Sequence, residues 1–412
     1  METIYRCCAG LDVHKQSVEA TVRCLEGSGR VRMETRHFRT FTRDLLEMSD
    51  WMSGEGVTHV AMESTGVYWK PIYNILESHF EVLLVNARHV KQVPGRKTDI
   101  KDCQWLAQLL QHGLLRGSFI PPRPIRQLRD LTRHRAQLVA EKTRVANRIQ
   151  KVLEDCNIKL ASVATDILGA SGRAMIQDMI KGESDPGKLA LHARRRLKEK
   201  IPELTLAMEG QVSEHHRFLL QLLWDQLSEL EALIERLERK VDEHMVPFQW
   251  AVDLVDEIPG IDRTVAQSII AEIGVDMGQY PTEKHLASWA GMSPGNNESA
   301  GKHKSGKTTK GNRWLKQSLV QAGWAASHAK KSYFSVLYSR LARRRGRKRS
   351  LIAVGHSLLV TVYNMLKHNQ SFADLGADYY DKRNVQYLTK HLVKRLESLG
   401  HKVILEQQLQ AA

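Results

Sequence analysis

Apolar residues in the first 120 positions recur with two different periods, and the two periods alternate along the chain. Alternation of apolar residues with polar or small ones predicts five strands, near residues 9–13, 18–24, 30–38, 58–63 and 81–86. Apolar spacings of three and four predict helices near residues 45–52, 67–77 and 99–112. The order is βββαβαβ followed by a helix, which predicts an α/β layered domain over residues 1–122.

Two long helical patterns follow a break at Pro121, Pro122 and Pro124. The first keeps near-heptad apolar spacing over residues 125–153, and the second alternates steps of four and three over residues 223–241. Such a seam predicts a helical coiled-coil region over residues 123–250, paired within or between chains. The first helix carries nine Lys and Arg against two acids between residues 123 and 151, so contact with phosphates is the alternative role for its basic face.

The rest of the chain predicts a mainly helical domain over residues 251–370 and a helical tail over residues 371–412. Ile258-Pro-Gly-Ile261 and the helical pattern after it resemble the second half of a helix-hairpin-helix. In such a unit a glycine turn and a helix N-terminus offer backbone N–H groups to a phosphate. A stretch rich in Gly, Lys and Ser over residues 293–316 predicts a basic loop.

Charge and composition indicate which kinds of partner this chain binds and in which compartment it works. The 412 residues carry a formal net charge of +15, which predicts binding to a polyanion, most commonly nucleic acid. An anionic membrane surface is the rival, but the apolar run at residues 351–366 is shorter than the roughly 20 residues that cross a bilayer and predicts a buried helix. The start of the chain lacks the apolar core of a signal peptide. The five cysteines form no CxxC pair, which favours a reducing cytoplasm and no structural zinc, while the missing anchor favours no membrane partner.

Four acidic residues stand where a carboxylate is unexpected or well placed for chemistry. Asp12 lies inside an apolar strand, Glu63 ends a second one, and Asp99 and Asp102 share one face of a helix through their i, i+3 spacing. Four converging carboxylates resist ionising together unless divalent cations neutralise them. Mg²⁺ prefers such oxygen ligands beside phosphates, and a pair of ions clamps the attacking and leaving oxygens of a phosphodiester. The pattern predicts a two-ion Mg²⁺ site.

Each of these acids also has a plainer interpretation. Asp99 alone is compatible with a helix N-cap, Asp102 with a solvated residue and Glu63 with a cap on the next helix. Asp12 has the weakest alternative, because a charge inside a strand needs a partner.

Three segments of the first half resemble the DEDD transposases of insertion sequences, the group related to the Piv DNA invertase. They are Gly10-Leu-Asp-Val-His-Lys15, Met62-Glu-Ser-Thr-Gly-Val-Tyr-Trp69 and Lys97-Thr-Asp-Ile-Lys-Asp102. The second half is similar to that family's C-terminal domain at Ala290-Gly-Met-Ser-Pro294, Glu298-Ser-Ala-Gly-Lys302 and Thr308-Thr-Lys-Gly-Asn-Arg313. The resemblance covers roughly residues 5–370 and implies a RuvC-like (ribonuclease-H-like) N-terminal domain over residues 1–122.

The resemblance also implies a mechanism and partners. Members of the family are recombinases guided by a structured bridge RNA that pairs with donor and target DNA. The four acids would bind Mg²⁺, and a serine of the C-terminal domain would join covalently to DNA. The family's signature maps onto Ser299-Ala-Gly-Lys302, which assigns the nucleophile to Ser299, with Ser305 as runner-up. The helical seam predicts a dimer, and the family further implies a tetramer of two dimers in the bacterial cytoplasm.

The residues around Ser299 fit that role on their own terms. A serine hydroxyl is a weak nucleophile unless a base or nearby positive charge activates it. No acid occurs from residue 301 to residue 316. The cations expected to hold the scissile phosphate are Lys302, Lys304, Lys307, Lys310 and Arg313. A flexible basic loop with an incidental serine is the plainer interpretation.

Other functions compete with transposition. A RuvC-like nuclease or junction resolvase would use the four acids with water and no covalent intermediate. A nucleic-acid chaperone fits the charge but gives no reason for Asp12 inside a strand. His192-Ala-Arg-Arg195 matches the HxxR pattern of tyrosine recombinases, within an arginine-rich run and without a supporting tyrosine motif.

Overall fold

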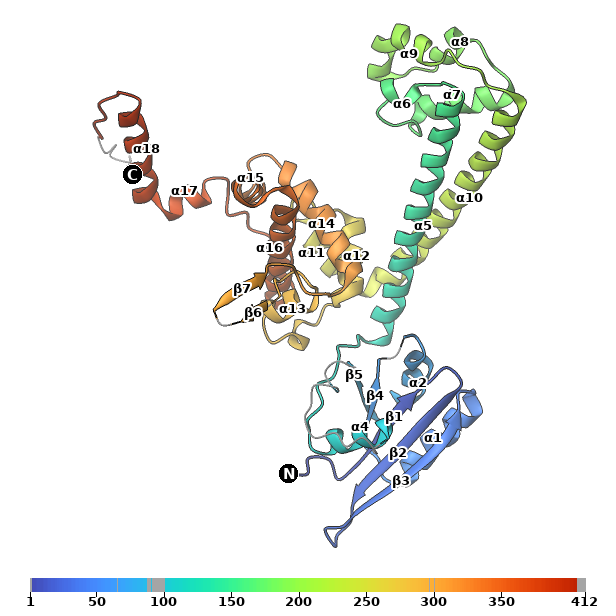
Figure 1. The fold of residues 1–412 in the computed structure, drawn as a ribbon, viewed down its shortest axis with the longest axis vertical. Helices are drawn as coiled ribbons and strands as arrows, with labels where there is room; N and C mark the ends of the chain where they lie inside the picture. Colours follow the sequence, from blue (N-terminus) through green and yellow to red (C-terminus); the bar gives the residue numbers. More distant parts are fainter. Residues whose placement is uncertain are drawn as a thin grey trace. The chain divides into compact units, whose positions relative to one another are not determined.

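A computed structural model describes residues 2–64, 66–86, 90, 101–295, 297–299 and 301–405, with backbone alone at 297–299 and 302–305. The chain divides into two compact units, Met1–Ile120 and Pro121–Ala412, which are described separately (Figure 1). The finer four-part division at residues 122, 250 and 370 stays a prediction.

The first unit is built on a five-stranded sheet of order β3-β2-β1-β4-β5. Its strands are β1 (Cys7–Val13), β2 (Ser17–Leu25), β3 (Val31–Arg39), β4 (His59–Glu63) and β5 (Glu81–Val85). Its helices are α1 (Thr42–Gly54), α2 (Trp69–Leu76) and α4 (Asp102–Gln111). β1, β2 and β3 pair antiparallel, whereas β4 pairs parallel with β1 and with β5. The predicted α/β order is confirmed, and the finer RuvC-like assignment remains a prediction.

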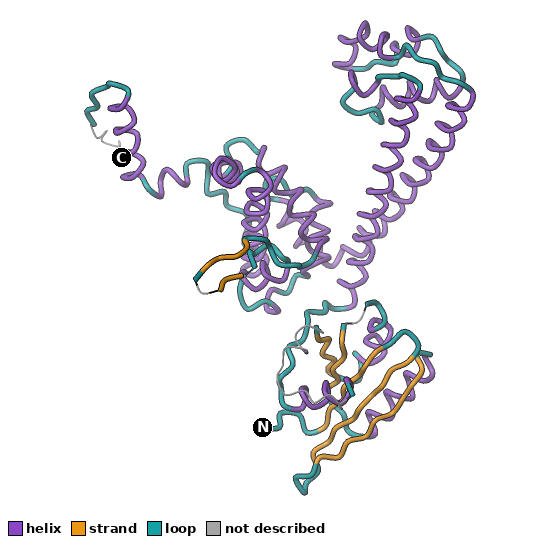
Figure 2. Tube along the Cα trace, in the orientation of Figure 1, coloured by secondary structure: helices purple, strands orange, loops and turns teal. Residues whose placement is uncertain are grey.

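Opposite faces of this sheet bury different helices (Figure 2). Leu11 and its neighbours on one face form a core with Leu45 of α1 and Ile72 of α2. On the other face Cys8 and Ala61 pack with Leu110 of α4. Gly10 lies against α4 so closely that a Cβ there would stand 2.2 Å from the Cys103 carbonyl oxygen. The small residues of β1 therefore let the backbone of α4 approach the sheet.

Two of the five cysteines face each other across neighbouring strands. The register of β1 and β2 places Cys7 directly opposite Cys24, and the structure joins them by a disulfide. Cys8, Cys103 and Cys156 are free and buried. No spacing pattern indicates this pair in the sequence, because strand register rather than sequence distance brings Cys7 and Cys24 together.

The second unit begins with a helical hairpin. α5 (Arg123–Asp155) runs out and α10 (Glu214–Met245) returns beside it (Figure 1). Leu138, Val145 and Ile149 of α5 share a core with Leu220 and Leu227 of α10. The two predicted apolar seams thus pack against each other within the chain, and the coiled-coil assignment stays a prediction.

Short helices fill the far end of that hairpin. They are α6 (Leu160–Val163), α7 (Ala170–Lys181), α8 (Pro186–Ala190), η1 (Arg195–Lys200) and α9 (Ile201–Ala207). Met175, Ile176 and Leu204 belong to the same core as the seam, so this tip is a continuation of the hairpin.

The remaining elements form a helical body that carries one small two-stranded sheet. Its helices are η2 (Val246–Phe248), α11 (Gln249–Asp256), α12 (Arg263–Ile273), η3 (Met277–Gln279), α13 (Glu283–Trp289), α14 (Arg313–His328), α15 (Tyr333–Arg345) and α16 (Arg347–His368). β6 (Asn297–Ser299) and β7 (Lys302–Ser305) pair between α13 and α14, and α17 (Tyr379–Arg383) and α18 (Val385–Ser398) follow. The mostly helical character predicted for this half is confirmed.

The apolar run at residues 351–366 lies in α16, where Val354, Leu358 and Val362 are fully buried. Tyr363 of the same helix donates a hydrogen bond to the Tyr280 carbonyl oxygen at 3.0 Å. No helix among the described residues is both long and apolar enough to span a bilayer.

We expect Gly10→Ala to lower the free energy of unfolding by about 2–3 kcal/mol, because the added methyl meets backbone atoms of α4 that cannot turn aside. Chemical unfolding followed by circular dichroism measures the change. Gly27→Ala is the matched control, since open space surrounds a Cβ at Gly27. Equal stability of the two variants would contradict the close packing of α4.

Candidate active site

Asp12 and Glu63 lie side by side at the ends of neighbouring strands. β1 and β4 are parallel with Leu11 opposite Met62, so the next residues in each strand are Asp12 and Glu63. Asp12 follows Gly10 by two positions and therefore lies on the sheet face that α4 covers. The pleat thus separates both carboxylates from the apolar core on the opposite face.

Asp102 is the first residue of α4. The same helical turn approaches β2, where the Lys101 ammonium lies 3.3 Å from a Glu19 carboxylate oxygen. The Cys103 thiol lies 4.0 Å from the same oxygen, Glu19 Oε2. The start of α4 is therefore close to the sheet end that carries Asp12, while Asp99 lies outside the described residues.

Glu19 is an acid at this end of the sheet that the sequence reasoning missed. It pairs with Asp12 across the β1–β2 hairpin, which closes with a hydrogen bond from the His14 N–H to the Ser17 carbonyl at 2.9 Å. The signal was present in the sequence, because counting outward from a tight hairpin at residues 14–17 places residue 19 opposite residue 12.

The electrostatics of this sheet end are consistent with cation binding. Burial, and less strongly the nearby Glu19 and Asp12 carboxylates, raises the pKa of the Cys103 thiol. Asp12 Oδ2 lies 3.2 Å from His14 Nε2, an imidazole that is largely exposed. Within the described part of the chain no three His, Cys, Asp or Glu side chains converge closely enough to hold a metal ion. Asp12 and Glu63 carry carboxylate oxygens, the ligand type that Mg²⁺ prefers, and the strand register makes the two residues neighbours.

The serine candidates lie on the β6–β7 hairpin of the second unit. Ser299 is the last residue of β6 and pairs with Lys302, beside a turn in which Gly301 has φ +73°. Ser305 pairs with Asn297 at the other end of the ribbon. Register therefore distinguishes the two serines, with Ser299 next to the turn and Ser305 next to the helical body.

The base of this hairpin is firmly attached to the helices. The Gly295 N–H donates to the Lys307 carbonyl at 2.9 Å, and Pro294 forms an isolated antiparallel β-bridge with Thr308. The Lys316 ammonium donates to Thr308 Oγ1 at 2.6 Å and to the Gly291 carbonyl at 3.2 Å. These bonds fix both strands where they leave the body.

Two family models match this chain, one over each of these regions. The first is described as a transposase of the DEDD type and matches residues 9–158, and the second, "Transposase IS116/IS110/IS902 family", matches residues 252–339. The chain belongs to the DEDD transposases of insertion sequences. Membership supports DNA transposase activity in general terms and DNA as a partner, and the family generally implies use of a divalent metal.

Two relatives of this transposase are similar over much of their length. A "Probable family 20 transposase" of Pseudomonas aeruginosa is 26% identical over 65% of this chain and 70% of its own. The "Insertion element IS116 uncharacterized 44.8 kDa protein" of Streptomyces clavuligerus is 26% identical over 52% of this chain and 60% of its own. The chain thus spans less than two thirds of the second relative.

A buried carboxylate connects the transposase's hairpin to its long helix α5. Glu272 of α12 is 2% exposed and accepts two hydrogen bonds from Arg133 of α5, at 2.7 and 2.8 Å. Its Oε2 also accepts from Asn312 Nδ2 at 2.5 Å. Asn312 in turn caps α14, accepting from the Trp314 and Leu315 N–H groups at 3.1 and 3.2 Å. One carboxylate therefore joins α5, α12 and the segment that follows β7.

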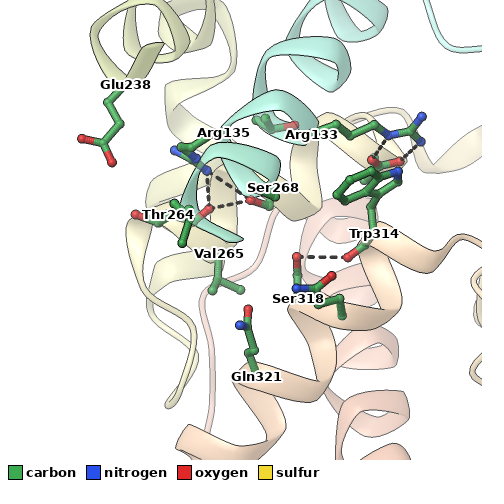
Figure 3. A pocket seen from close by; sticks show the side chains of 14 residues that line it. Arg133, Arg135, Glu238, Thr264, Val265, Ser268, Trp314, Ser318 and Gln321 are labelled. Atoms are coloured by element: carbon green, nitrogen blue, oxygen red, sulfur yellow. Dashed lines mark hydrogen bonds and ion pairs between the residues drawn. The ribbon is translucent and has the colours of Figure 1, made fainter. Parts of the chain in front are cut away.

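Arginines of α5 that the sequence left open for phosphate contact have structural roles. Arg135 is 4% exposed and donates to Gln267 Oε1, the Thr264 carbonyl and Ser268 Oγ. Figure 3 shows it beside Thr264 and Ser268, with Arg133 and Trp314 together on the other side of the same pocket. Burial lowers the pKa of Arg135, the expected effect of desolvating a cation.

The helix-hairpin-helix expectation is only half right. α11 and α12 do form a helical pair, but a Cβ at Gly260 would stand 2.4 Å from the Ala326 nitrogen of α14. The start of α12 is capped by Asp262, whose Oδ1 accepts from the Val265 N–H at 2.8 Å. A phosphate at this turn is therefore disfavoured, because α14 packs against the glycine and a carboxylate already occupies the helix end.

The basic residues predicted to hold phosphate lie along and after the hairpin. Lys302 and Lys304 are in β7, while Lys307, Lys310 and Arg313 are exposed. The Arg313 guanidinium lies over the Trp314 ring at 4.7 Å, which orders it at the start of α14.

We expect Glu272→Ala to lower the free energy of unfolding by about 3–5 kcal/mol, because it leaves the partly buried Arg133 and the cap of α14 without their partner. Glu243→Ala is the control, as Glu243 pairs with Lys240 only at the exposed surface and its loss leaves stability near that of the wild type. Urea titration of both variants makes the comparison. A Glu272→Ala protein as stable as the control would contradict the role of this carboxylate.

Proposed function

We propose that this transposase is an RNA-guided DNA recombinase, in which Ser299 attacks DNA and the acids at the end of the N-terminal sheet bind Mg²⁺. The observation that carries the proposal is the β6–β7 hairpin, which puts Ser299 beside a turn and opposite Lys302. The segment from residue 301 to residue 316 contains no acid and carries Lys302, Lys307 and Arg313 among its cations, while Glu298 is the acid next to the serine. The family resemblance adds the guide RNA.

The covalent step exchanges one phosphodiester for another. The Ser299 oxygen forms a bond to phosphorus, the bond from phosphorus to a DNA oxygen breaks, and that oxygen leaves with a proton as a hydroxyl. Attack of a different DNA hydroxyl reverses the step, releases the serine and joins a new strand. The number of phosphodiester bonds is conserved, so no nucleotide hydrolysis is needed.

The chain's cations have defined tasks in this step. Lys307, Lys310 and Arg313 are exposed next to the hairpin, where they neutralise the phosphate and stabilise the charge that develops on its oxygens. Mg²⁺, when bound by Asp12, Glu63, Asp99 and Asp102, supplies Lewis-acid activation of a phosphate oxygen. Recombination of two duplexes needs several serine nucleophiles at once, which calls for an oligomer. The α5–α10 seam packs within one chain, so it is not needed as the contact between subunits.

We expect Ser299→Ala and Asp102→Ala each to reduce recombination by at least about a thousandfold, as loss of a nucleophile does in other hydroxyl-dependent enzymes. The protein is produced in bacteria beside its element with both noncoding flanks, and recombinant junctions are counted by quantitative amplification. Ser305→Ala is the matched control and keeps wild-type junction counts. Full activity of Ser299→Ala would refute the assignment, and loss of activity in Ser305→Ala alone would transfer it to Ser305.

We expect a covalent protein–DNA adduct that depends on Ser299. Purified protein with guide RNA, Mg²⁺ and end-labelled DNA is denatured in detergent, and label that migrates with the protein is measured. Chelation of the metal and Asp102→Ala should each remove the adduct. Continued DNA cutting by Ser299→Ala without any adduct would instead indicate a RuvC-like nuclease or junction resolvase.

A further inference from the structure

The tip of the α5–α10 hairpin contains a cavity of about 640 Å³ with one basic wall. One wall is the loop before α7 and that helix's first turn, from Val163 to Ser171. The other is the segment that begins η1, with Arg194, Arg195, Arg196 and Lys200. Asp166 is the only acid among the lining residues, and its Oδ1 already accepts from the Leu168 N–H at 2.9 Å.

The three arginine side chains of this cavity, Arg194, Arg195 and Arg196, are exposed and make no hydrogen bond or ion pair with the described residues. This contrasts with Arg133, Arg135 and Arg173, whose guanidinium groups all bind protein oxygens. Three adjacent cations repel one another, so an arrangement that gathers them around a cavity is favoured by an anion.

The two walls are held in place from behind. The Arg194 N–H donates to Ser171 Oγ at 3.0 Å, which ties the arginine segment to α7. His192 Nε2 lies 2.6 Å from Asp178 Oδ2 on the same helix, so the HxxR histidine has a structural partner. The other wall is fixed by Arg173, which donates to the Leu168 carbonyl and pairs with Glu231 of α10.

Backbone geometry supports a role beyond packing. Arg195 has φ +53°, a left-handed conformation that residues with a Cβ rarely adopt. Such a conformation persists where the surrounding structure enforces it, and it occurs more often at binding sites than elsewhere. Here it lies in the middle of the three arginines.

We propose that this arginine cavity binds the phosphodiester backbone of a nucleic acid strand. Guanidinium groups match phosphate oxygens in geometry and charge, and a cavity of this size admits consecutive phosphates. The choice of nucleic acid over other polyanions rests on the proposed function. The site is separate in sequence from both the acids of the sheet and the serine hairpin, so it would add affinity and positioning without taking part in strand cleavage.

The test is equilibrium binding of the full-length protein to two fluorescent probes over a range of salt concentrations. One probe is RNA transcribed from the element's noncoding flank, and the other is duplex DNA of equal length. Arg194→Gln/Arg195→Gln/Arg196→Gln is compared with wild type, with the charge-preserving triple Lys variant, and with Lys181→Gln/Lys188→Gln. Lys181 and Lys188 are the matched control, because Asp178 and Glu183 already neutralise them on the same tip.

We expect the Gln triple variant to lower the slope of log affinity against log salt by about 2–3 for the bound probe, roughly one counterion per lost phosphate contact. The Lys triple variant and the control should keep the wild-type slope, and circular dichroism should be unchanged in all of them. A reduced slope of the Gln triple variant with either probe or with both supports the site. The probe that shows the reduction identifies whether the bound phosphodiester backbone is RNA, DNA or either. An unchanged slope with both probes, or an equal loss in the control, overturns it.

Failure of this site is distinguishable from failure of the proposed function. If wild type binds neither probe, the proposed function fails. If wild type binds and the Gln variant binds with the same slope, only the arginine cavity is refuted. Ser299→Ala should bind both probes with the wild-type slope, since the cavity contains no part of the serine hairpin.

Discussion

The second half of this transposase depends on one buried carboxylate. Glu272 is almost fully enclosed and balances Arg133 of α5, while its second oxygen receives the amide of the α14 cap, Asn312. A lone charge at such a depth would be strongly unfavourable, so partners and carboxylate are needed together. Because those partners come from α5 and from the residue just before α14, their pairing fixes the segment that leaves the serine hairpin. The long helix, the helical body and the hairpin are thereby held in one arrangement.

The first half depends on a different constraint, the small side chains of β1. Gly10 admits the backbone of α4 to the sheet face that also carries Asp12 and, in the parallel register, Glu63. A larger residue at position 10 would hold α4, and with it Asp102, farther from those acids. The opposite sheet face is filled by aliphatic residues, so the pleat separates a polar edge from an apolar core. The fold thus supplies both stability and a place for hard oxygen ligands.

Many of the strands and helices can be predicted from the sequence, because their apolar periodicity agrees with the burial of the same residues in the structure. The strands near residues 9–13 and 58–63 and the seam of α5 and α10 each follow a clear apolar period, and the structure has them. Contacts set by register were not accessible in the same way. The Cys7–Cys24 disulfide and the Asp12–Glu19 pair depend on how two strands align, which a single sequence constrains only through the hairpin turn. The catalytic roles of Asp99 and Ser299 stay predictions.

The elements, the basic charge and the family to which the motifs belong can all be predicted from the sequence, because periodicity and motif residues are local properties of the chain. Which charges are free depends on the tertiary structure. The sequence does not distinguish Arg133 and Arg135 from Arg194 and Arg195. In the structure the first two donate hydrogen bonds to residues of α12, whereas the other two line a cavity and their guanidinium groups have no partner among the described residues. Gly260 likewise reads as a phosphate turn until α14 is seen to pack on it. The reason is that desolvation and partner choice arise only when distant segments meet.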